Sequence, residues 1–197
     1  MDYKIVGLVG PLACGKGVVA DYLIKKYHYI SFSLSSIVHE EVKKRGIIRY
    51  NRTLLQNIGN ELREKEGDGV LARRALNMLY TSHSIANGKI IIEGIRNPGE
   101  VDYLRTFPGF FLIAVHASQK IRFQRVLTRG KPWDPKDWKT FLQVDERDRG
   151  EERKISGQQV QKCVQLADIQ LQNNKSIAEF YAVIEKTIGS LFRVSET

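Results

Sequence analysis

The sequence has few cysteines and no long apolar run. Its 197 residues include only Cys14 and Cys163, which are too few for a disulfide framework and lack the spacing of metal ligands. No apolar segment approaches the length of a membrane span, and no basic leader with a long apolar stretch precedes the first expected strand. These absences predict a soluble, unexported protein of the reducing cytoplasm.

Internal repeats and low-complexity tracts are also missing, and no module of interleaved aromatic and basic residues for stacking on bases is visible. The chain does carry an excess of positive charge, because 31 Lys and Arg against 22 Asp and Glu give a net charge of +9. This balance favours anionic partners. Small nucleotides are the expected partners, nucleic acid is disfavoured, and the oligomeric state is not specified.

Five short β-rich segments alternate with helical segments, which predicts a parallel sheet covered on both faces. The expected strands are Lys4–Val9, Tyr29–Ser33, Lys89–Glu93, Phe110–Val115 and Asp168–Leu171. Two longer polar stretches, Ser36–Asn87 and Gly130–Gln165, interrupt the alternation. Because ligands of open α/β sheets bind beyond the carboxyl ends of the strands, these stretches are expected to cover an active site.

A glycine-rich segment joins the first expected strand to a helix-like stretch. It runs from Gly10 to Gly17 and reads G-P-L-A-C-G-K-G. Glycines permit close backbone approach, while the amides of a helix N-terminus and Lys16 attract the phosphates of a nucleoside triphosphate. The expected contacts are Gly10, Ala13, Cys14, Gly15, Lys16, Gly17 and Val18. Gly17 stands where a Ser or Thr commonly holds Mg²⁺, so the loop offers no hydroxyl for the metal at this position.

With this loop, the strand ends and the two polar stretches, the chain resembles P-loop kinases of the nucleoside monophosphate kinase and dephospho-CoA kinase group, especially archaeal kinase-like proteins. The resemblance implies a three-layer α/β/α P-loop NTPase fold, similar to adenylate kinase, with a five-stranded parallel sheet. It implies one domain over 1–197, with a core of 1–35, 88–129 and 166–197, an acceptor-binding insertion of 36–87 and a lid of 130–165. The implied reaction moves the γ-phosphoryl group of Mg²⁺-ATP to a nucleotide-like acceptor.

The third expected strand ends in Glu93-Gly94-Ile95-Arg96, which is similar to the Asp-Gly-Phe-Pro-Arg of these kinases. The resemblance implies that Glu93 orients Mg²⁺-bound water. It implies that Arg96 grips a phosphate of the acceptor through its planar fork and takes part in catalysis. A simple ion pair with a neighbouring lysine is the alternative for Glu93.

Arginines recur on the helix expected after the fourth strand, where Arg122, Arg125 and Arg129 share one face. The similar helix of adenylate kinase implies that Arg125 lies over the donor base and Arg129 on the phosphates. For Arg122, a functional role and a solvated position on the helix surface are equally consistent with the sequence. Asn173 and Asn174 follow the fifth strand, where dephospho-CoA kinases have a loop beside the donor base. Turn residues before a helix need no ligand, so that role also stays open.

The segment Trp138–Arg153 resembles the lid helix of these kinases, with Asp134 as its N-cap. The resemblance implies that either Arg147 or Arg149 reaches the transferred phosphoryl group when the lid closes. Exposed ion pairs with the interleaved acidic residues explain the same pattern.

The acceptor side departs most from the family pattern. Adenylate kinases hold the acceptor phosphate with an arginine after the second strand, where this chain has Ser36, His39 and Glu40. Dephospho-CoA kinases place an Asp there as the base for a ribose hydroxyl, and none lies in Ser31–Ser36. Because a phosphate acceptor is already ionised and needs no base, a nucleoside monophosphate is favoured. Glu40 keeps transfer to a ribose hydroxyl open.

A helix expected to begin with the capping-box pair Thr53 and Gln56 carries Arg63, which matches a motif of the archaeal relatives. Arg63 is a candidate to replace the missing acceptor arginine, and a surface ion pair with Glu66 is the alternative. The departures at Val18 and His39 also leave open a nucleotide-binding regulator with little turnover.

Overall fold

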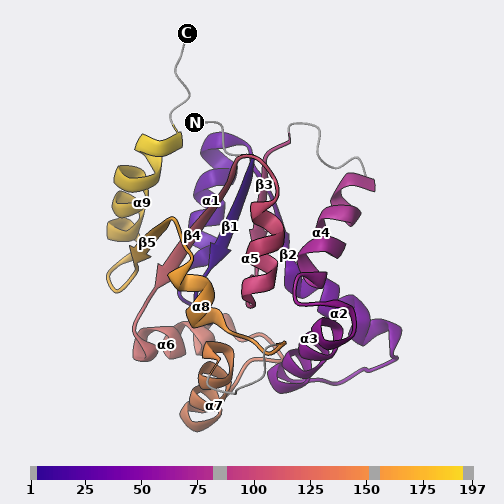
Figure 1. Cartoon of the computed structure of the whole chain (residues 1–197). Coiled ribbons are helices and arrows are strands. Elements are labelled where there is room, and N and C mark those ends of the chain that lie inside the picture. Colours follow the sequence, from indigo (N-terminus) through magenta and orange to yellow (C-terminus); the bar gives the residue numbers. More distant parts are fainter. Residues whose placement is uncertain (1–3, 82–87, 151–155, 193–197) are drawn as a thin grey trace.

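The computed structural model describes residues 4–81, 88–150 and 156–192. At its centre is a five-stranded sheet, in the order β2-β3-β1-β4-β5, with every adjacent pair parallel (Figure 1). The strands are β1 (Ile5–Val9), β2 (Ile30–Ser33), β3 (Ile90–Glu93), β4 (Phe110–His116) and β5 (Ile169–Gln172). Each strand starts and ends within one residue of its predicted bounds, so the predicted α/β fold is confirmed.

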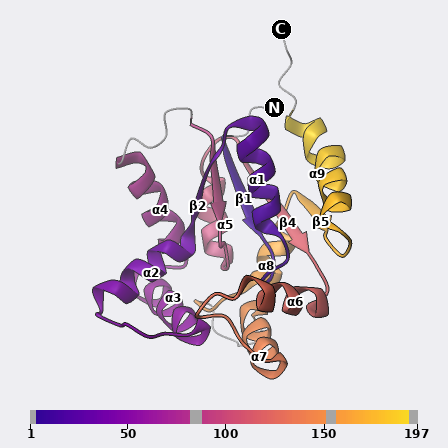
Figure 2. The same ribbon diagram turned by 180° about the vertical axis from the view of Figure 1, so that it is seen from behind.

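Helices cover both faces of the sheet. α1 (Lys16–Tyr27) and α9 (Ile177–Phe192) lie on one face, and α5 (Pro98–Arg105) and α8 (Val160–Gln165) lie on the other (Figures 1 and 2). The other described helices are α2 (Leu34–Lys44), α3 (Arg52–Glu66), α4 (Val70–Thr81), α6 (Gln119–Arg129) and α7 (Trp138–Arg149). Among the described residues, no helix has both the length and the apolar character that a membrane crossing needs.

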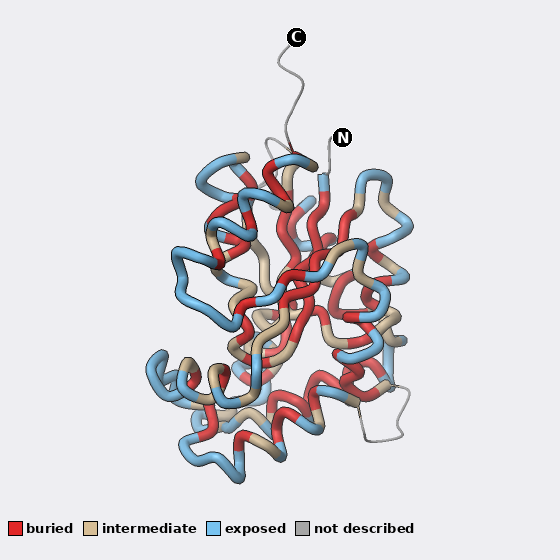
Figure 3. The backbone as a smooth tube through the Cα atoms, turned by 90° about the vertical axis from the view of Figure 1, so that its left-hand side faces the viewer, coloured by how far each residue is buried: buried red, intermediate tan, exposed pale blue. Residues whose placement is uncertain are grey.

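Two apolar clusters, one on each face of the sheet, hold the layers together. Successive side chains of a strand point to opposite faces, and β1 follows this rule. Val6 and Leu8 pack with α1 and α9, whereas Ile5 and Val9 pack in the cluster that includes α2, α3, α4, α5 and α8. Figure 3 shows buried residues along the middle of the sheet and at intervals along the helices. Burial on both faces explains why β1, β3 and β4 read as continuous apolar runs, whereas the edge strands β2 and β5 carry alternating polar residues.

The path of the chain opens a crevice at the carboxyl end of the sheet. The connection from β1 to β2 runs through α1 on one face, and the connection from β3 to β4 runs through α5 on the other. β1 and β3 are neighbours, so the loops that follow them diverge at this edge, which is where open α/β sheets bind ligands. α2, α3, α6 and α7 surround the same edge (Figure 1).

The start of α3 differs from the prediction. Its N-cap is Asn51, whose side-chain oxygen accepts a hydrogen bond from the backbone amide of Leu54, 3.0 Å away. The predicted capping box at Thr53 and Gln56 is therefore wrong. Gln56 is instead buried inside the protein, where its side-chain amide donates to Asp148.

The start of α7 also differs. Asp137 is its N-cap and accepts a hydrogen bond from the amide of Thr140 at 2.8 Å, so the predicted cap at Asp134 is wrong. The physical reason is that the Asp134 carboxylate is buried and occupied by two arginines. The helix ends at Arg149, and positions 151–153 of the predicted helix lie outside the described residues.

Candidate active site

The glycine-rich loop after β1 adopts a conformation that depends on its glycines. Gly10 has φ of 141° and Gly15 has φ of 110°, and both values lie in the region that side chains disfavour. A Cβ atom on Gly10 would overlap the carbonyl oxygen of Val115, and one on Gly15 would overlap the side-chain amide of Asn173. The loop therefore lies tightly against β4 and the end of β5, with α1 beginning directly after Gly15.

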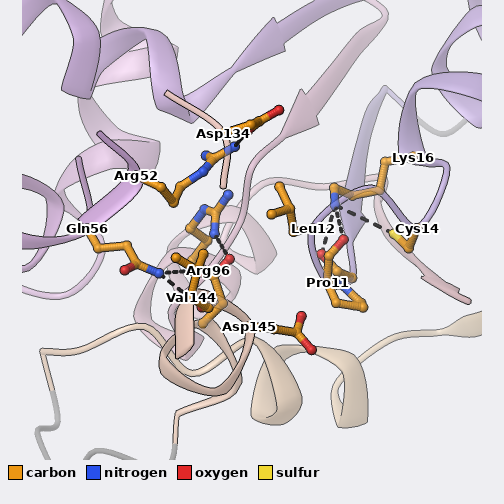
Figure 4. A network of polar contacts seen from close by, with 12 residues as sticks. Pro11, Leu12, Cys14, Lys16, Arg52, Gln56, Arg96, Asp134, Val144 and Asp145 are labelled. Atoms are coloured by element: carbon orange, nitrogen blue, oxygen red, sulfur yellow. Dashed lines mark hydrogen bonds and ion pairs between the residues drawn. The ribbon is translucent and has the colours of Figure 1, made fainter. Parts of the chain in front are cut away.

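Lys16 folds back over this loop. Its ammonium donates to the carbonyl oxygens of Gly10 at 2.7 Å and Pro11 at 3.0 Å, and it lies 3.6 Å from the Cys14 sulfur (Figure 4). A cation held across a loop at the N-terminus of a helix is suited to bind polyphosphate oxygens. Cys14 itself is fully buried in the apolar cluster beneath α1, which fits the role of a small core residue.

Gly17 has space around it. An added Cβ atom would meet no atom within 4 Å. Steric crowding therefore does not require a glycine at position 17, where P-loops commonly carry Ser or Thr. Val18, the next residue, is partly buried against the apolar cluster on the α1 face.

A cavity of about 530 Å³ opens at the crevice, within the ~300–1,000 Å³ range of small-molecule sites. It brings together residues from the P-loop, α2, α3, the end of β3, and the segment that follows α6. Its lining comprises Leu12, Ala13, Lys16, Ser33, Ser35, Ser36, His39, Glu40, Lys43, Arg52, Glu93, Gly94, Arg96, Arg129, Lys131 and Trp133. Of the residues that the sequence singled out, Ala13, Lys16, Ser36, His39, Glu40, Glu93, Arg96 and Arg129 face this one cavity.

Arg52 is the main functional candidate that sequence reasoning missed. It is the first residue of α3, and its guanidinium and that of Arg96 point toward one another across the cavity from Lys16 (Figure 4). Burial lowers the pKa of Arg52, and the positive charge of Arg96 lowers it further. Within the described part of the chain, its buried Nε atom has no hydrogen-bond partner. Two partly buried guanidinium groups and an unused donor form an environment that favours an anion.

Two buried carboxylates hold the arginines of the cavity in place. Asp134 accepts from Arg52 at 3.0 Å and from the Nε of Arg129 at 2.6 Å. Asp148, on α7, accepts from Arg96 at 2.5 Å, and the charges of Arg96 and Arg52 keep the pKa of its buried carboxyl below its usual value. The acidic residues of the predicted lid therefore include two, Asp134 and Asp148, that are buried and bind arginines of the cavity. Exposed ion pairs do not explain these two residues.

Arg63 has a different environment from the one predicted. It is 2% exposed, and its Nε and Nη2 atoms donate to Glu100 at 3.0 and 2.7 Å. Glu100 also accepts from the backbone amide of Arg96, at 2.7 Å. Arg63 does not line the main cavity, and the predicted alternative of a surface pair with Glu66 is wrong because Glu66 pairs with Arg74. The Arg63–Glu100 pair therefore holds the backbone at Arg96, three residues after the end of β3.

The arginines of α6 have different side-chain partners. Arg122 is buried and forms a two-pronged ion pair with Asp145, at 2.5 and 2.7 Å. Arg125 donates to the backbone oxygen of Cys14 at 3.3 Å and so contacts the P-loop, whereas Arg129 lines the cavity. α6 keeps the three arginines on the predicted face, but the solvated alternative for Arg122 is wrong, because the buried carboxylate of Asp145 binds it.

The two asparagines after β5 have structural partners. Asn173 is buried, and its side-chain amide donates to the backbone oxygen of Cys14 at 2.8 Å. Asn174 accepts from the backbone amide of Ser118 at 2.8 Å, at the start of α6. Both residues hold the P-loop and α6 against β5, and a contact with adenine stays a prediction.

Neither lid arginine lies in the main cavity. Arg147 donates to Asn57 on α3 at 2.7 Å, and Arg149 lies 3.5 Å from Asp145. The predicted contact of one of them with the transferred phosphoryl group stays a prediction that would require α7 to move.

Glu93 lies at the end of β3, faces the same cavity as Lys16, and accepts a hydrogen bond from the Ser31 hydroxyl at 2.8 Å. In the described part of the chain, no three His, Cys, Asp or Glu side chains come together as a metal site. A magnesium ion here would need oxygen ligands from a nucleotide, with Glu93 as an acidic partner that binds its water ligands.

Comparison with known proteins agrees with this geometry. A sequence profile described as an AAA domain matches residues 6–157. A UPF0200 protein from Methanococcus maripaludis strain C6 is 32% identical over 191 residues, covering 97% of this chain and 99% of that protein.

Solved structures share the fold at low sequence identity. The TT1252 structure from Thermus thermophilus has a TM-score of 0.61 at 17% identity and covers 96% of this chain and 98% of that one. Shikimate kinase from Acinetobacter baumannii, in complex with shikimate, has a TM-score of 0.54 at 15% identity, with coverage of 96% and 95%. The architecture is that of a P-loop kinase.

Proposed function

This chain belongs to the UPF0200 family, and we propose that it is an ATP-dependent phosphotransferase that moves the γ-phosphoryl group of Mg²⁺-ATP to a nucleoside monophosphate. The observation that carries the proposal is the cavity between Lys16 and the Arg52–Arg96 pair. One wall offers a P-loop for the donor phosphates. The opposite wall offers two partly buried guanidinium groups for the phosphate of an acceptor.

The phosphate, and not a hydroxyl, is the proposed acceptor group because cations dominate the wall opposite the P-loop. Arg52 and Arg96 provide planar forks that match phosphate oxygens, and Arg52 has an unused buried donor. His39 lies beside them in the cavity, where burial, Arg52 and Lys131 lower the pKa of its imidazole. A neutral imidazole adds no charge, so the arginines set the preference for an anion.

Catalysis in this proposal rests on alignment and charge. Lys16 would leave the carbonyl oxygens of the loop and bind the β- and γ-phosphates, while Arg129 would approach the transferred group from α6. Asp134 binds both Arg52 and Arg129 and thus acts as a positioning residue that holds one acceptor-side and one donor-side cation at a fixed spacing. Residues 36–87 would serve as the acceptor-binding insertion and residues 130–165 as a lid that excludes water.

Magnesium would be held by the phosphates of ATP and, through water, by Glu93, and it would offset charge on the phosphoryl oxygens. We expect Glu93→Gln to weaken the affinity for a non-hydrolysable ATP analogue in the presence of Mg²⁺ and to leave the affinity in EDTA nearly unchanged. Calorimetric titration under both conditions measures this difference. If both affinities fall together with the melting temperature, Glu93 is structural and has no metal role.

Arg52→Ala should raise the KM of a nucleoside monophosphate at least ~10-fold, because a charge-assisted hydrogen bond contributes ~1.5–3 kcal/mol. The affinity for the ATP analogue should change less than twofold, since Arg52 lies on the wall opposite the P-loop. Arg49→Ala is the matched control, because it removes an equally charged but exposed side chain three residues away. An equal loss in both variants, or a loss of ATP-analogue affinity alone, contradicts the acceptor role.

Two other functions make different predictions. If the protein transfers phosphoryl groups to a ribose hydroxyl, dephospho-CoA alone should stimulate ADP release, and Glu40→Gln should abolish that stimulation. If the protein is a regulator, it should bind ATP without acceptor-dependent ADP formation. A screen of ADP release over ribo- and deoxynucleoside monophosphates and dephospho-CoA separates the three functions, and we expect a monophosphate to give the fastest rate.

A further inference from the structure

An aromatic cluster contributes two of its three rings, those of His39 and Trp133, to the lining of the cavity. Its members are His39 on α2, Tyr50 in the loop before α3, and Trp133 in the segment between α6 and α7. The Trp133 ring lies 4.7 Å from the His39 ring and stacks on Tyr50 with an interplanar angle of 18°. The His39 Nδ1 atom is 3.0 Å from the Tyr50 hydroxyl. Three separate segments thus hold one indole ring in a defined orientation.

This ring packs against the apolar cluster that includes α2 and α3, and it also forms part of the cavity wall. Trp133 is partly exposed and lines the cavity together with Glu40 and Lys43 of α2. Nearby, the exposed Lys131 places its ammonium 5.7 Å from the centre of the indole ring. The second tryptophan of the chain, Trp138, packs on Phe123 and Phe141 outside the cavity.

Trp133 is adjacent in the chain to the carboxylate that holds two arginines of the cavity, Arg52 and Arg129. The next residue, Asp134, is buried and holds both Arg52 and Arg129. An acceptor that places its phosphate between Arg52 and Arg96 therefore has a flat aromatic surface at a fixed place along the same cavity. A sugar phosphate or a polyol has no aromatic face to use it, whereas a nucleobase gains stacking energy from it.

Building on the proposed function, we infer that Trp133 is the platform on which the base of the acceptor stacks, with Glu40 and Lys43 available to the polar edge of that base. The cavity then selects acceptors that combine an aromatic base with a phosphate. Selection by stacking tolerates different bases because every base has an aromatic face. Selection against base-free phosphates follows from the same contact.

Tryptophan fluorescence tests this inference without turnover. In the Trp138→Phe variant, Trp133 is the single tryptophan, since the chain has only two. We expect AMP, GMP, CMP and UMP, titrated singly, to include at least one that quenches the emission saturably. Ribose 5-phosphate, which has the sugar and phosphate but no base, should leave the emission within the baseline. Equal quenching by ribose 5-phosphate, or no quenching by any nucleotide, overturns the inference.

Steady-state kinetics supply an independent readout. Trp133→Leu should raise the KM of the active monophosphate about 10-fold or more, with the affinity for an ATP analogue unchanged, because base stacking is worth ~1–3 kcal/mol. Trp133→Phe keeps an aromatic face and should recover most of the loss. An unchanged KM in Trp133→Leu overturns the stacking inference while phosphotransfer to the monophosphate stands. If nucleotides quench the emission but no ADP forms, the stacking inference is supported. The same result contradicts the proposed phosphotransfer.

Discussion

Lys16→Ala is expected to lower the turnover of acceptor-dependent ADP formation at least ~10²-fold, the loss typical when one electrostatic donor to the transition state is removed. Lys16 is the cation built into the P-loop, and its ammonium already lies over the loop, 2.7 Å from the Gly10 carbonyl oxygen. Its partners in the described structure are two loop carbonyl oxygens and the Cys14 sulfur, so its removal leaves no carboxylate without a partner. The fold should therefore persist without it.

Initial rates of ADP release, together with the melting temperature, measure this effect. Lys25→Ala is the control, because Lys25 is an exposed lysine on the same helix. A folded Lys16→Ala variant with unchanged turnover would contradict phosphate binding by the loop.

Arg63→Ala is expected to lower the free energy of unfolding by about 3–5 kcal/mol, the loss typical when one partner of a buried ion pair is removed. The side chain of Arg63 is 1% exposed and that of Glu100 is fully buried. Among the described residues, removing the guanidinium leaves the carboxylate of Glu100 with two backbone amides as donors, those of Arg96 and Asn97.

Urea denaturation of the wild-type protein and the variant measures this difference. Arg74→Ala is the control, because its pair with Glu66 lies at the surface, where ion pairs contribute ~0–1 kcal/mol. We also expect the KM of the acceptor to stay near the wild-type value in the folded variant. A stable Arg63→Ala protein with a raised KM would return Arg63 to the acceptor site.

The sequence predicts well what local signals determine. The three central strands, β1, β3 and β4, are buried along most of their length, so their apolar runs identify them within a residue. The glycines and Lys16 of the P-loop are adjacent in the chain. The cavity also contains Glu93 and Arg96, which lie at a strand end, where such sheets place functional residues.

The residues that sequence analysis missed depend on contacts between distant segments. Arg52 follows an ordinary helix cap and looks like a surface cation, yet Asp134, 82 positions later, buries it in the cavity. Asp148 sits among alternating charges that are typical of a solvated helix, and only its contact with Arg96, 52 positions away, reveals its burial. The motif match at Arg63 could not reveal that Glu100 binds its guanidinium, and a role of Arg63 toward the acceptor stays a prediction.

The most direct test of the central claim follows the γ-phosphoryl group itself. Purified protein is incubated with γ-labelled ATP, Mg²⁺ and each nucleoside monophosphate, and the products are separated. We predict that the label appears in a nucleoside diphosphate at a rate that depends on the acceptor, and that Lys16→Ala abolishes it. Label that appears only as inorganic phosphate, at a rate no monophosphate changes, would contradict the account.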